Sequence, residues 1–404
     1  MKDTSIRFGG VDWASAAHAI CVVDAEGTIV ERFEVAHSAR GLGELCRRLV
    51  RARVDRVAIE RPDGPVVDAL MGAGLEVVVI ASRQIKALRE RYGSAGNKDD
   101  VLDAYVLADC LGSDGHRLVA LRPDGPATVT LRACVRARKD LVAQRVATAN
   151  QLRAHLAVVF PGAVGLFADI DGPTSLRFLA RFPSAASAAW LSERRLGAWL
   201  RANGYCGRRS AGELYGRLRE APAGLGGEQG RTRAAVTEAF VAVLVTLRAQ
   251  IEALTARIGE QLALHPDGQI FCSLPRSGTV RAAALLAEIG DCRERFPSPE
   301  ALACLAGAAP STRASGKHRA ITFRWAADKK LREALVDFAG DSRHANPWAA
   351  DLYARARARG KTNPHAERIL ARAWCGVIWR MWQDRLPYDP ERHRALQRLQ
   401  AVGG

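Results

Sequence analysis

The chain has 404 residues, a formal net charge of +16 and nine cysteines. Its length allows two or three domains with substantial cores, and its basic excess favours a polyanionic partner. The odd, scattered cysteines lack any Cys-x-x-Cys pair, which argues against a zinc finger and a secreted disulfide framework. The first residues lack the apolar region of a signal peptide, and no uninterrupted apolar run approaches membrane-spanning length, so we expect a cytoplasmic protein without a membrane partner.

Residues 1–125 are predicted to form an α/β domain with a mixed sheet. Three antiparallel strands come first, and alternating helices and strands follow, which is the order that gives this fold class. A hairpin turn is expected at 25–27. The predicted strands cover residues 6–12, 18–24, 29–36, 54–60 and 75–80. The predicted helices lie near 41–51, 65–73, 84–92 and 100–110.

Four acidic residues lie where these predicted elements end or begin. Asp12 ends the first strand, and Glu60 ends the fourth. Asp100 and Asp103 are three residues apart at the start of a helix, so they share one face of it. Two carboxylates on one face are suited to a divalent metal with oxygen ligands. An acidic first turn that only stabilises the helix is the alternative.

The segments around these acids resemble three motifs of a known family. They read Val-Asp-Trp-Ala at 11–14, Ile-Glu-Arg-Pro at 59–62 and Asn-Lys-Asp-Asp-Val-Leu-Asp-Ala at 97–104. These are similar to the acidic motifs of the DEDD transposases of the insertion-sequence-110 family, a pattern that Piv-type DNA invertases share. The element order resembles the RNase H-like (RuvC-like) fold.

The resemblance implies a metal site for DNA strand cleavage. It assigns Asp12, Glu60, Asp100 and Asp103 as ligands of one or two Mg²⁺ ions. Two bridged Mg²⁺ ions can activate a nucleophile and stabilise the leaving oxygen of a phosphodiester. The family's third motif has Lys-Thr-Asp where this chain has Lys98-Asp99-Asp100, and the i,i+3 spacing to Asp103 favours Asp100 over Asp99 as the ligand.

Residues 126–265 are predicted to be a helical, coiled-coil region. Apolar residues at helical spacing fill 131–160, and Pro161-Gly162 ends that helix. A second helix over 234–264 carries a heptad seam. The seam consists of Phe240, Leu244, Leu247, Ile251, Leu254 and Ile258. Such a seam predicts a partner helix, either in the same chain or in a second copy of a homo-oligomer (a dimer or tetramer).

The insert between the two long helices, residues 161–230, is rich in Gly and Arg. Short helices are predicted near 185–202 and 210–220. We assign no site there, because the arginines fit a solvated face as well as a nucleic-acid contact.

Residues 266–390 are predicted to form a mainly helical domain, followed by a tail over 391–404. A tight turn over 271–278 precedes an apolar helix at 280–289, and its backbone N–H groups could meet a DNA phosphate. The resembling family has Pro-Gly-Ile-Gly at this turn. Arg276 replaces the first of those glycines, so we expect it to contact the phosphate. A helix over 326–335 would offer Lys329 and Lys330 to phosphates.

A serine motif lies in the same domain. A small-residue helix is expected to end near Gly307, and a loop to follow it. The Ala-Pro-x-x-x-x-Ser-Gly pattern at 309–316 resembles the C-terminal motif of the same family, whose serine is the nucleophile. The resemblance assigns Ser315, with Ser311 as the alternative. A phosphoserine ester keeps the bond energy, so the strand can be rejoined without ATP. The cations expected to stabilise the phosphate are Arg313, Lys317 and Arg319.

Aromatic residues are concentrated in the last part of the chain. Trp374, Ile378 and Met381 follow a helical stripe, which predicts a core position. Stacking of nucleic-acid bases on one or two aromatics of this part remains open. The candidates are Trp348, Tyr353, Trp374, Trp379 and Trp382.

The resemblance implies a transposase or site-specific recombinase that cuts and rejoins the DNA of its insertion element. It also implies a structured (bridge) guide RNA as a second partner, and a nucleoid-associated location. A RuvC-like, metal-dependent nuclease of the junction-resolvase type, without covalent serine chemistry, is the main alternative. A sugar kinase or ATPase of the actin-like superfamily would need further glycine-rich phosphate loops, which we do not find. A non-catalytic nucleic-acid binder is the remaining alternative.

Overall fold

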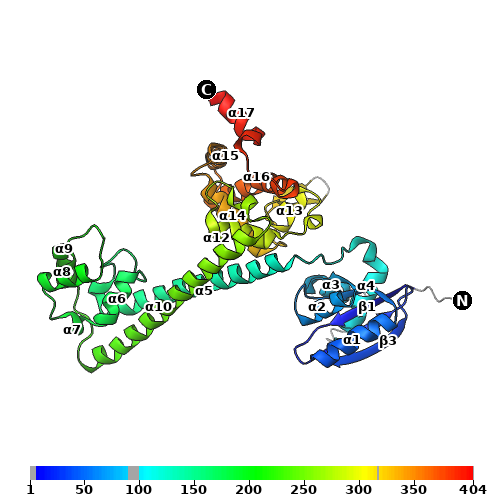
Figure 1. Ribbon diagram of the computed structural model, residues 1–404, viewed down its shortest axis with the longest axis horizontal. Helices are drawn as coiled ribbons and strands as arrows, with labels where there is room; N and C mark the ends of the chain where they lie inside the picture. The colour runs from blue at the N-terminus through cyan, green and yellow to red at the C-terminus, as the bar shows by residue number, and fades with distance from the viewer. Residues whose placement is uncertain (1–5, 90–99, 316–317, 404) are drawn as a thin grey trace. The chain divides into compact units, whose positions relative to one another are not determined.

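The computed structural model describes residues 6–89, 100–315 and 318–403 of the chain. The chain divides into two compact units, Met1–Pro123 (unit 1) and Asp124–Gly404 (unit 2). Figure 1 labels the elements of both units. All nine cysteines are free thiols, as the sequence predicted.

Unit 1 contains a five-stranded mixed sheet in the order β3-β2-β1-β4-β5. β1 is antiparallel to β2 and parallel to β4, while β3 is antiparallel to β2 and β5 is parallel to β4. The expected mixed α/β domain is therefore confirmed. Its strands are β1 (Arg7–Asp12), β2 (Ala17–Val23), β3 (Ile29–Ala36), β4 (Val54–Ile59) and β5 (Glu76–Val79). Its helices are α1 (Ala39–Arg51), α2 (Pro65–Gly72), α3 (Ser82–Arg89), α4 (Asp100–Asp114) and the 3₁₀ helix η1 (Gly115–Arg117).

The two faces of this sheet are covered by different helices. Val11 of β1 is buried in a core with residues of α1 and α2. Side chains alternate along a strand, so the neighbours of Val11 face the other way. On that second face Ala58 is buried with Val106 and Leu107 of α4. α4 therefore lies over the centre of the sheet.

Gly10 allows α4 to lie directly on β1. A Cβ at Gly10 would be 2.0 Å from the carbonyl oxygen of Ala104 and 2.6 Å from the nitrogen of Ala108, which a real side chain cannot tolerate. One helical turn further on, Gly112 lies near Phe8, because a Cβ there would be 3.6 Å from the Phe8 ring. α4 thus runs antiparallel to β1, and its first turn points toward the Asp12 end of the strand.

Replacing Gly10 with Ala is expected to destabilise unit 1 by about 1–3 kcal/mol, because the methyl group overlaps the α4 backbone. The free energy of unfolding in urea measures the change. Gly72→Ala is the matched control, since a Cβ there meets nothing within 4 Å. Equal effects of the two substitutions would contradict this packing of α4 on β1.

Unit 2 is built on two long antiparallel helices, α5 (Pro126–Val159) and α10 (Gly227–Leu264). Thr128 Oγ1 and His265 Nε2 are 2.8 Å apart at one end of the pair, and His155 Nε2 and Thr237 Oγ1 are 3.0 Å apart toward the other. Leu244, Ile251 and Ile258 of the predicted seam are buried, and Phe240, Leu247 and Leu254 are half-buried. The partner helix that the seam predicted is thus present within this chain. A coiled coil in the strict sense is not established by this packing.

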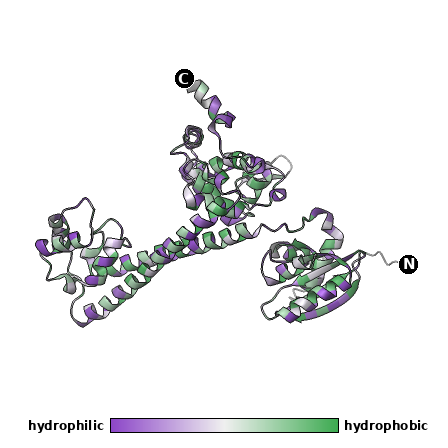
Figure 2. Ribbon diagram, in the orientation of Figure 1, coloured by the Kyte–Doolittle hydropathy of each residue, from purple (hydrophilic) through white to green (hydrophobic). Residues whose placement is uncertain are grey.

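By length and composition α10 is also the one helix among the described residues that could cross a membrane. The prediction concerned uninterrupted apolar runs, and charged residues such as Glu238 and Arg248 interrupt α10. The core helix of a soluble protein passes the same test of length and composition. Figure 2 shows polar residues interspersed with apolar ones along α5 and α10.

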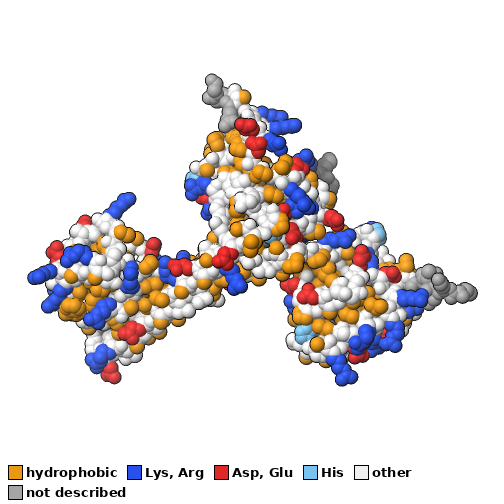
Figure 3. All heavy atoms as spheres, viewed as in Figure 1, with side chains coloured by type: hydrophobic (Ala, Val, Ile, Leu, Met, Phe, Trp, Pro, Cys, Tyr) orange, Lys and Arg blue, Asp and Glu red, His pale blue; other side chains and the backbone are white. Residues whose placement is uncertain are grey.

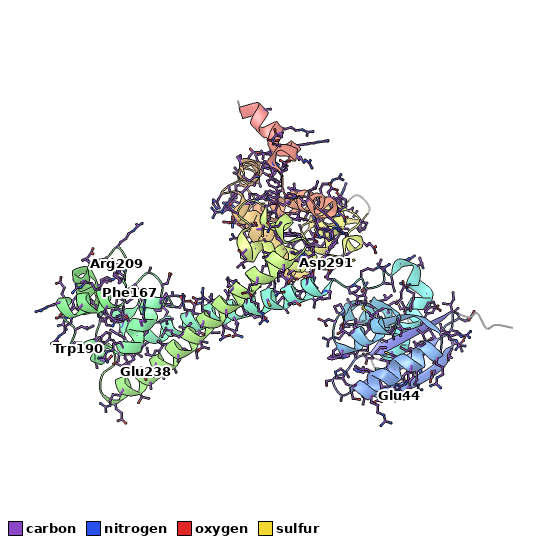
Figure 4. All side chains as sticks on the ribbon, viewed as in Figure 1. Glu44, Phe167, Trp190, Arg209, Glu238 and Asp291 are labelled. Atoms are coloured by element: carbon purple, nitrogen blue, oxygen red, sulfur yellow. The ribbon has the colours of Figure 1, made fainter. Side chains whose placement is uncertain are left out.

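The insert between α5 and α10 packs a small core of its own against the two long helices. Phe178 and Phe182 are buried there with Leu152 of α5 and Leu244 of α10. Figure 4 labels Phe167, Trp190 and Arg209 of this insert. Its helices are η2 (Pro161–Ala163), α6 (Pro173–Arg181), α7 (Ala185–Ala188), α8 (Glu193–Ala202) and α9 (Ala211–Glu220). The helix predicted over 210–220 is confirmed as α9, with a capping box at Ser210 and Glu213. The stretch predicted over 185–202 is helical as α7 and α8, which residues 189–192 separate.

The rest of unit 2 is a helical domain with one β-hairpin. Trp374, Ile378 and Met381 are buried in its core, as the helical stripe predicted, and Trp382 is buried with them. Its first helices are α11 (Gly268–Cys272), α12 (Gly278–Ile289), η3 (Arg293–Arg295) and α13 (Pro299–Leu305). The hairpin strands β6 (Ser311–Ser315) and β7 (His318–Thr322) follow. The last helices are α14 (Lys329–Ser342), α15 (Pro347–Ala358), α16 (Asn363–Asp384), η4 (Pro390–Arg392) and α17 (Arg394–Gly403).

Two sequence predictions for this domain were wrong in detail. The predicted loop after Gly307 contains a β-hairpin, because residues on both sides of 316–317 pair in antiparallel register. The helix predicted from residue 326 begins at Lys329, because the Asp328 carboxylate accepts hydrogen bonds from the backbone N–H groups of Lys330 and Leu331 as the N-cap.

Candidate functional site

Asp12 and Glu60 lie side by side at one edge of the sheet. Val11 of β1 is level with Ile59 of the parallel strand β4, so the residues that follow each are also level. Adjacent strands lie about 4.8 Å apart. By strand alternation Asp12 lies on the face of Gly10, and Glu60 on the face of Ala58, which is the face that α4 covers.

One contact joins the ends of β1 and β4, and a second fixes the Glu60 carboxylate. The guanidinium carbon of Arg61 lies 4.3 Å from the centre of the Trp13 ring, so the residues that follow the two acids are in contact. The Ser82 hydroxyl at the start of α3 donates a hydrogen bond of 2.9 Å to the Glu60 carboxylate. Asp12 and Glu60 are both partly exposed, so their carboxylates are accessible to a ligand.

Asp103 lies in the first turn of α4 and is 2% exposed. Its carboxylate forms an ion pair with Arg89 of α3. Its second oxygen, Oδ1, is buried and has no hydrogen-bond partner in the described part of the chain. A buried carboxylate oxygen is costly unless a donor or a cation satisfies it. Asp103 therefore fits the role of a metal ligand.

The four predicted metal ligands are only partly described. Asp100 begins α4 one turn from Asp103, but its side chain lies outside the described residues, as do Asn97, Lys98 and Asp99. Among the side chains that are described, no three His, Cys, Asp or Glu residues are grouped closely enough to hold a metal ion. The assembled four-acid site thus stays a prediction. It is supported by the position of Asp12 beside Glu60 and by the direction of α4.

Arg89 is a functional candidate that the sequence analysis missed, because no motif marks it. Its guanidinium pairs with Asp103 and so occupies one carboxylate oxygen that a metal ion would need.

Without divalent ions, Arg89→Gln is expected to lose about 1–3 kcal/mol of stability, since Asp103 would be left buried without its counter-charge. With Mg²⁺ present, the gain in melting temperature should exceed that of the wild type, because a competing cation has been removed.

Lys86→Gln is the matched control for this prediction, since Lys86 is an exposed cation of the same helix. It should change neither the stability nor the Mg²⁺ response. An Arg89 variant whose melting temperature responds to Mg²⁺ as the wild type does would exclude competition at Asp103.

Ser315 is the last residue of β6 and is exposed at the tip of the hairpin. It pairs with His318 of β7, and residues 316–317 between them lie outside the described chain. Ser311 is half-buried at the base of the hairpin, and its carbonyl oxygen accepts a hydrogen bond from the Thr322 hydroxyl. Of the two candidate nucleophiles, Ser315 is the more accessible.

The predicted phosphate-binding cations fall into three groups. Arg319, Lys329 and Lys330 are exposed. Lys317 and the side chain of Arg313 lie outside the described residues. Arg276 is engaged already, because its Nε lies 3.0 Å from a carboxylate oxygen of Asp341. This hydrogen bond holds the pKa of Asp341 below its usual range. A phosphate would have to compete with Asp341 for Arg276.

Trp325, just after β7, is a second feature that sequence analysis missed. Its side chain is 78% exposed, whereas the aromatics considered for base stacking include Trp348, Trp374 and Trp382 of the core. The alternation of cationic and aromatic residues at 323–325, Phe-Arg-Trp, was the available indication. Exposure of one aromatic and burial of others cannot be read from composition alone.

Profile comparisons identify the class of protein. A DEDD transposase profile of the IS110 type matches residues 9–161. A second profile, for transposases of the IS116/IS110/IS902 family, matches residues 268–354. Transposases are enzymes that cut and rejoin DNA. The chain belongs to the IS110/IS116/IS902 family of transposases.

Individual relatives agree with this family. The mini-circle protein assigned as the transposase for IS117 in Streptomyces coelicolor is 31% identical over 97% of both chains. The 43.6 kDa protein of insertion element IS110 from the same organism is 29% identical over 78% of both chains. A Thermus (T. thermophilus) RuvC, solved in complex with a Holliday junction substrate, aligns with 29% of this chain and 99% of its own at 17% identity. Its TM-score of 0.23 is too low to carry an argument.

Proposed function

We propose that this transposase cuts and rejoins the DNA of its element with a DEDD metal site and a serine nucleophile. In this proposal Asp12, Glu60, Asp100 and Asp103 hold Mg²⁺, and Ser315 forms the covalent bond to DNA. The observation that carries the metal site is the level placement of Asp12 and Glu60 on the face covered by α4. The strand order β3-β2-β1-β4-β5 supports an RNase H-like fold for unit 1.

The serine step conserves the phosphodiester bond energy. The Ser315 oxygen bonds to phosphorus as its hydroxyl proton leaves, and the bond from phosphorus to the sugar oxygen of the leaving strand breaks. That sugar oxygen takes up a proton. Attack by the hydroxyl of a second strand reverses these changes and releases Ser315, so no ATP is needed. Arg319 pairs with Ala314, the neighbour of Ser315, near the hairpin tip. A cation there would stabilise the charge of the phosphate.

In this proposal the carboxylates hold the divalent cations in place and balance their charge. Bound divalent cations would activate a nucleophile and stabilise the leaving oxygen. Ser82 holds the Glu60 carboxylate through a hydrogen bond, which restricts the directions in which it can bind an ion. Burial of Asp103 strengthens its attraction for cations, since the local dielectric is low.

The proposed partners are DNA, a structured (bridge) RNA and a further copy of the chain. Figure 3 shows Lys and Arg side chains over each part of the visible face, and the chain carries a net charge of +16. This charge supports binding through phosphates, which DNA and RNA share. Val236 and Val243 of α10, seven residues apart on one helical face, are 38% and 49% exposed, which supports contact with a helix of another copy.

One observation favours a second candidate function. The acids and the serine belong to different compact units, so the acids of unit 1 could act without Ser315. The chain would then be a metal-dependent nuclease that uses water as the nucleophile. Such an enzyme would leave cleaved ends and no protein–DNA adduct.

The experiment that separates the two functions is a search for covalently attached DNA. Full-length protein is incubated with Mg²⁺, labelled DNA of the element's ends and the candidate RNA, then denatured. Mass spectrometry of the digested protein should find a nucleotide on Ser315, and EDTA should prevent its formation. Cleavage without any adduct would favour the hydrolytic nuclease over the serine recombinase.

A further inference from the structure

Trp325 is an exposed aromatic residue with no role in the proposed metal site or in the proposed serine step. Its ring meets Phe323 edge-on, with the ring centres 4.8 Å apart, yet 78% of the side chain is exposed. Exposed tryptophan is unusual, because indole has a large apolar surface. Ile321, two residues before Phe323, is 69% exposed as well. The end of the hairpin thus presents apolar surface to the solvent.

Phe323 is a rigid support for the Trp325 ring. The guanidinium carbons of Arg332 and Arg368 lie 4.6 Å and 4.9 Å from the centre of the Phe323 ring. Arg332 is itself fixed, because it donates a hydrogen bond of 2.6 Å to the carbonyl of Arg324 and one of 3.3 Å to that of Ala306. Burial, with the charge of Arg368 nearby, lowers the pKa of Arg332. α14 and α16 therefore hold the ring on which Trp325 rests.

Cations lie on both sides of Trp325 in the chain. Arg319 precedes it on β7, while Lys329 and Lys330 follow it at the exposed start of α14. The closest acid in the sequence, Asp328, accepts two backbone hydrogen bonds as the cap of α14. An exposed apolar ring between cationic segments of the chain matches a nucleotide, which combines an aromatic base with a charged phosphate.

The hairpin limits the distance between Trp325 and Ser315. His318 is paired with Ser315, about 5 Å away across the hairpin, and Trp325 lies seven positions after His318. A fully extended chain covers about 3.3 Å per residue, so Ser315 and Trp325 lie within roughly 28 Å of each other. Stacked nucleotides advance about 3.4 Å each along a strand. A base on Trp325 would therefore lie within about eight nucleotides of a phosphate at Ser315.

We propose that Trp325 is a stacking platform for an unpaired base of the DNA strand that is cut or joined at Ser315. The choice of DNA as the ligand rests on the proposed function, in which Ser315 attacks DNA. Trp325 directly follows the hairpin that carries Ser315. Phe323 holds the indole upright, and the cations at both ends bind the flanking phosphates. The platform positions the strand; it does not contact the reacting phosphate.

The test measures binding apart from chemistry. Full-length protein in EDTA is titrated with labelled single-stranded DNA, with the same sequence as RNA, and with fully paired duplex. Trp325→Ala should weaken single-stranded DNA binding about 10- to 100-fold, the size of one lost stacking contact. Trp325→Phe should restore most of the affinity, and duplex binding should change less than about twofold. A 2-aminopurine base within about eight nucleotides of the cut site should be quenched by the wild type and not by Trp325→Ala.

Trp190→Ala is the matched control, because Trp190 is a 50% exposed tryptophan that lies 5.0 Å from the Arg195 guanidinium carbon. It should leave all three affinities unchanged, and melting curves should be the same for all variants. Unchanged single-strand affinity of Trp325→Ala would overturn the platform, as would an equal loss on duplex. A loss confined to RNA would overturn the assignment to DNA. None of these outcomes depends on the Ser315 adduct, so the platform and the serine mechanism can fail separately.

Discussion

Replacing Asp12 with Asn is expected to lower DNA strand cleavage about a thousandfold or more, which corresponds to about 4 kcal/mol of transition-state stabilisation. Asp12 lies level with Glu60 at the ends of adjacent parallel strands, and in the proposed site both carboxylates bind the same ion. An amide has nearly the same shape but no charge, so the local fold should be preserved. The initial rate of strand cleavage in Mg²⁺ measures the effect.

Asp68→Asn is the control for charge, since Asp68 is an exposed acid of α2, on the opposite side of the sheet from α4. This variant should cleave as the wild type does, and both variants should bind element DNA with similar affinity. Normal cleavage by the Asp12 variant would contradict the proposed metal site. The cleavage would then be catalysed by other residues.

Much of unit 1 could be predicted from the sequence, because period-two apolar patterns and turn residues are local. β1 and β4 end within one residue of the predicted positions, next to Asp12 and Glu60. Their placement side by side was implied only by the resemblance to the RNase H-like fold, and the parallel pairing of β1 with β4 agrees with it. What could not be predicted is the pairing of Asp103 with Arg89, because it joins two helices through side chains that carry no pattern.

The predictions for unit 2 were limited for another physical reason. A heptad seam indicates that a helix has a partner, but the partner can belong to the same chain or to another. The choice of α5 depends on contacts such as His155 with Thr237, more than 80 residues apart in sequence. The segment after Gly307 has the composition of a turn, yet its flanks pair as β6 and β7. Short exposed strands of polar residues carry almost no periodic pattern.

The hairpin distinguishes the two candidate nucleophiles, Ser311 and Ser315. In a free loop Ser311 and Ser315 would be similar candidates, since both are small hydroxyl residues near cations. In the hairpin they lie on the same face of β6 but at opposite ends, because residues four apart in a strand point the same way. Only Ser315 is exposed at the tip, where a phosphate can approach it without displacing the strand pairing.

Ser315→Ala is therefore expected to abolish both the covalent DNA adduct and strand rejoining, with a loss of at least about a thousandfold. Methyl for hydroxyl at an exposed position should leave the melting temperature within about 2 °C of the wild type, since surface changes are nearly neutral. The adduct is quantified on denaturing gels with end-labelled DNA, and rejoining by the appearance of recombined strands.

Ser311→Ala separates the two serines. Its hydroxyl is half-buried, and the carbonyl that accepts the Thr322 bond survives the substitution, so the hairpin and the adduct should both persist. If Ser311→Ala lost the adduct while Ser315→Ala kept it, the nucleophile would lie at the base of the hairpin. If both variants formed it, the covalent step would use another residue. Retained cleavage together with lost adduct in Ser315→Ala would show that the acids of unit 1 can direct water as well as serine.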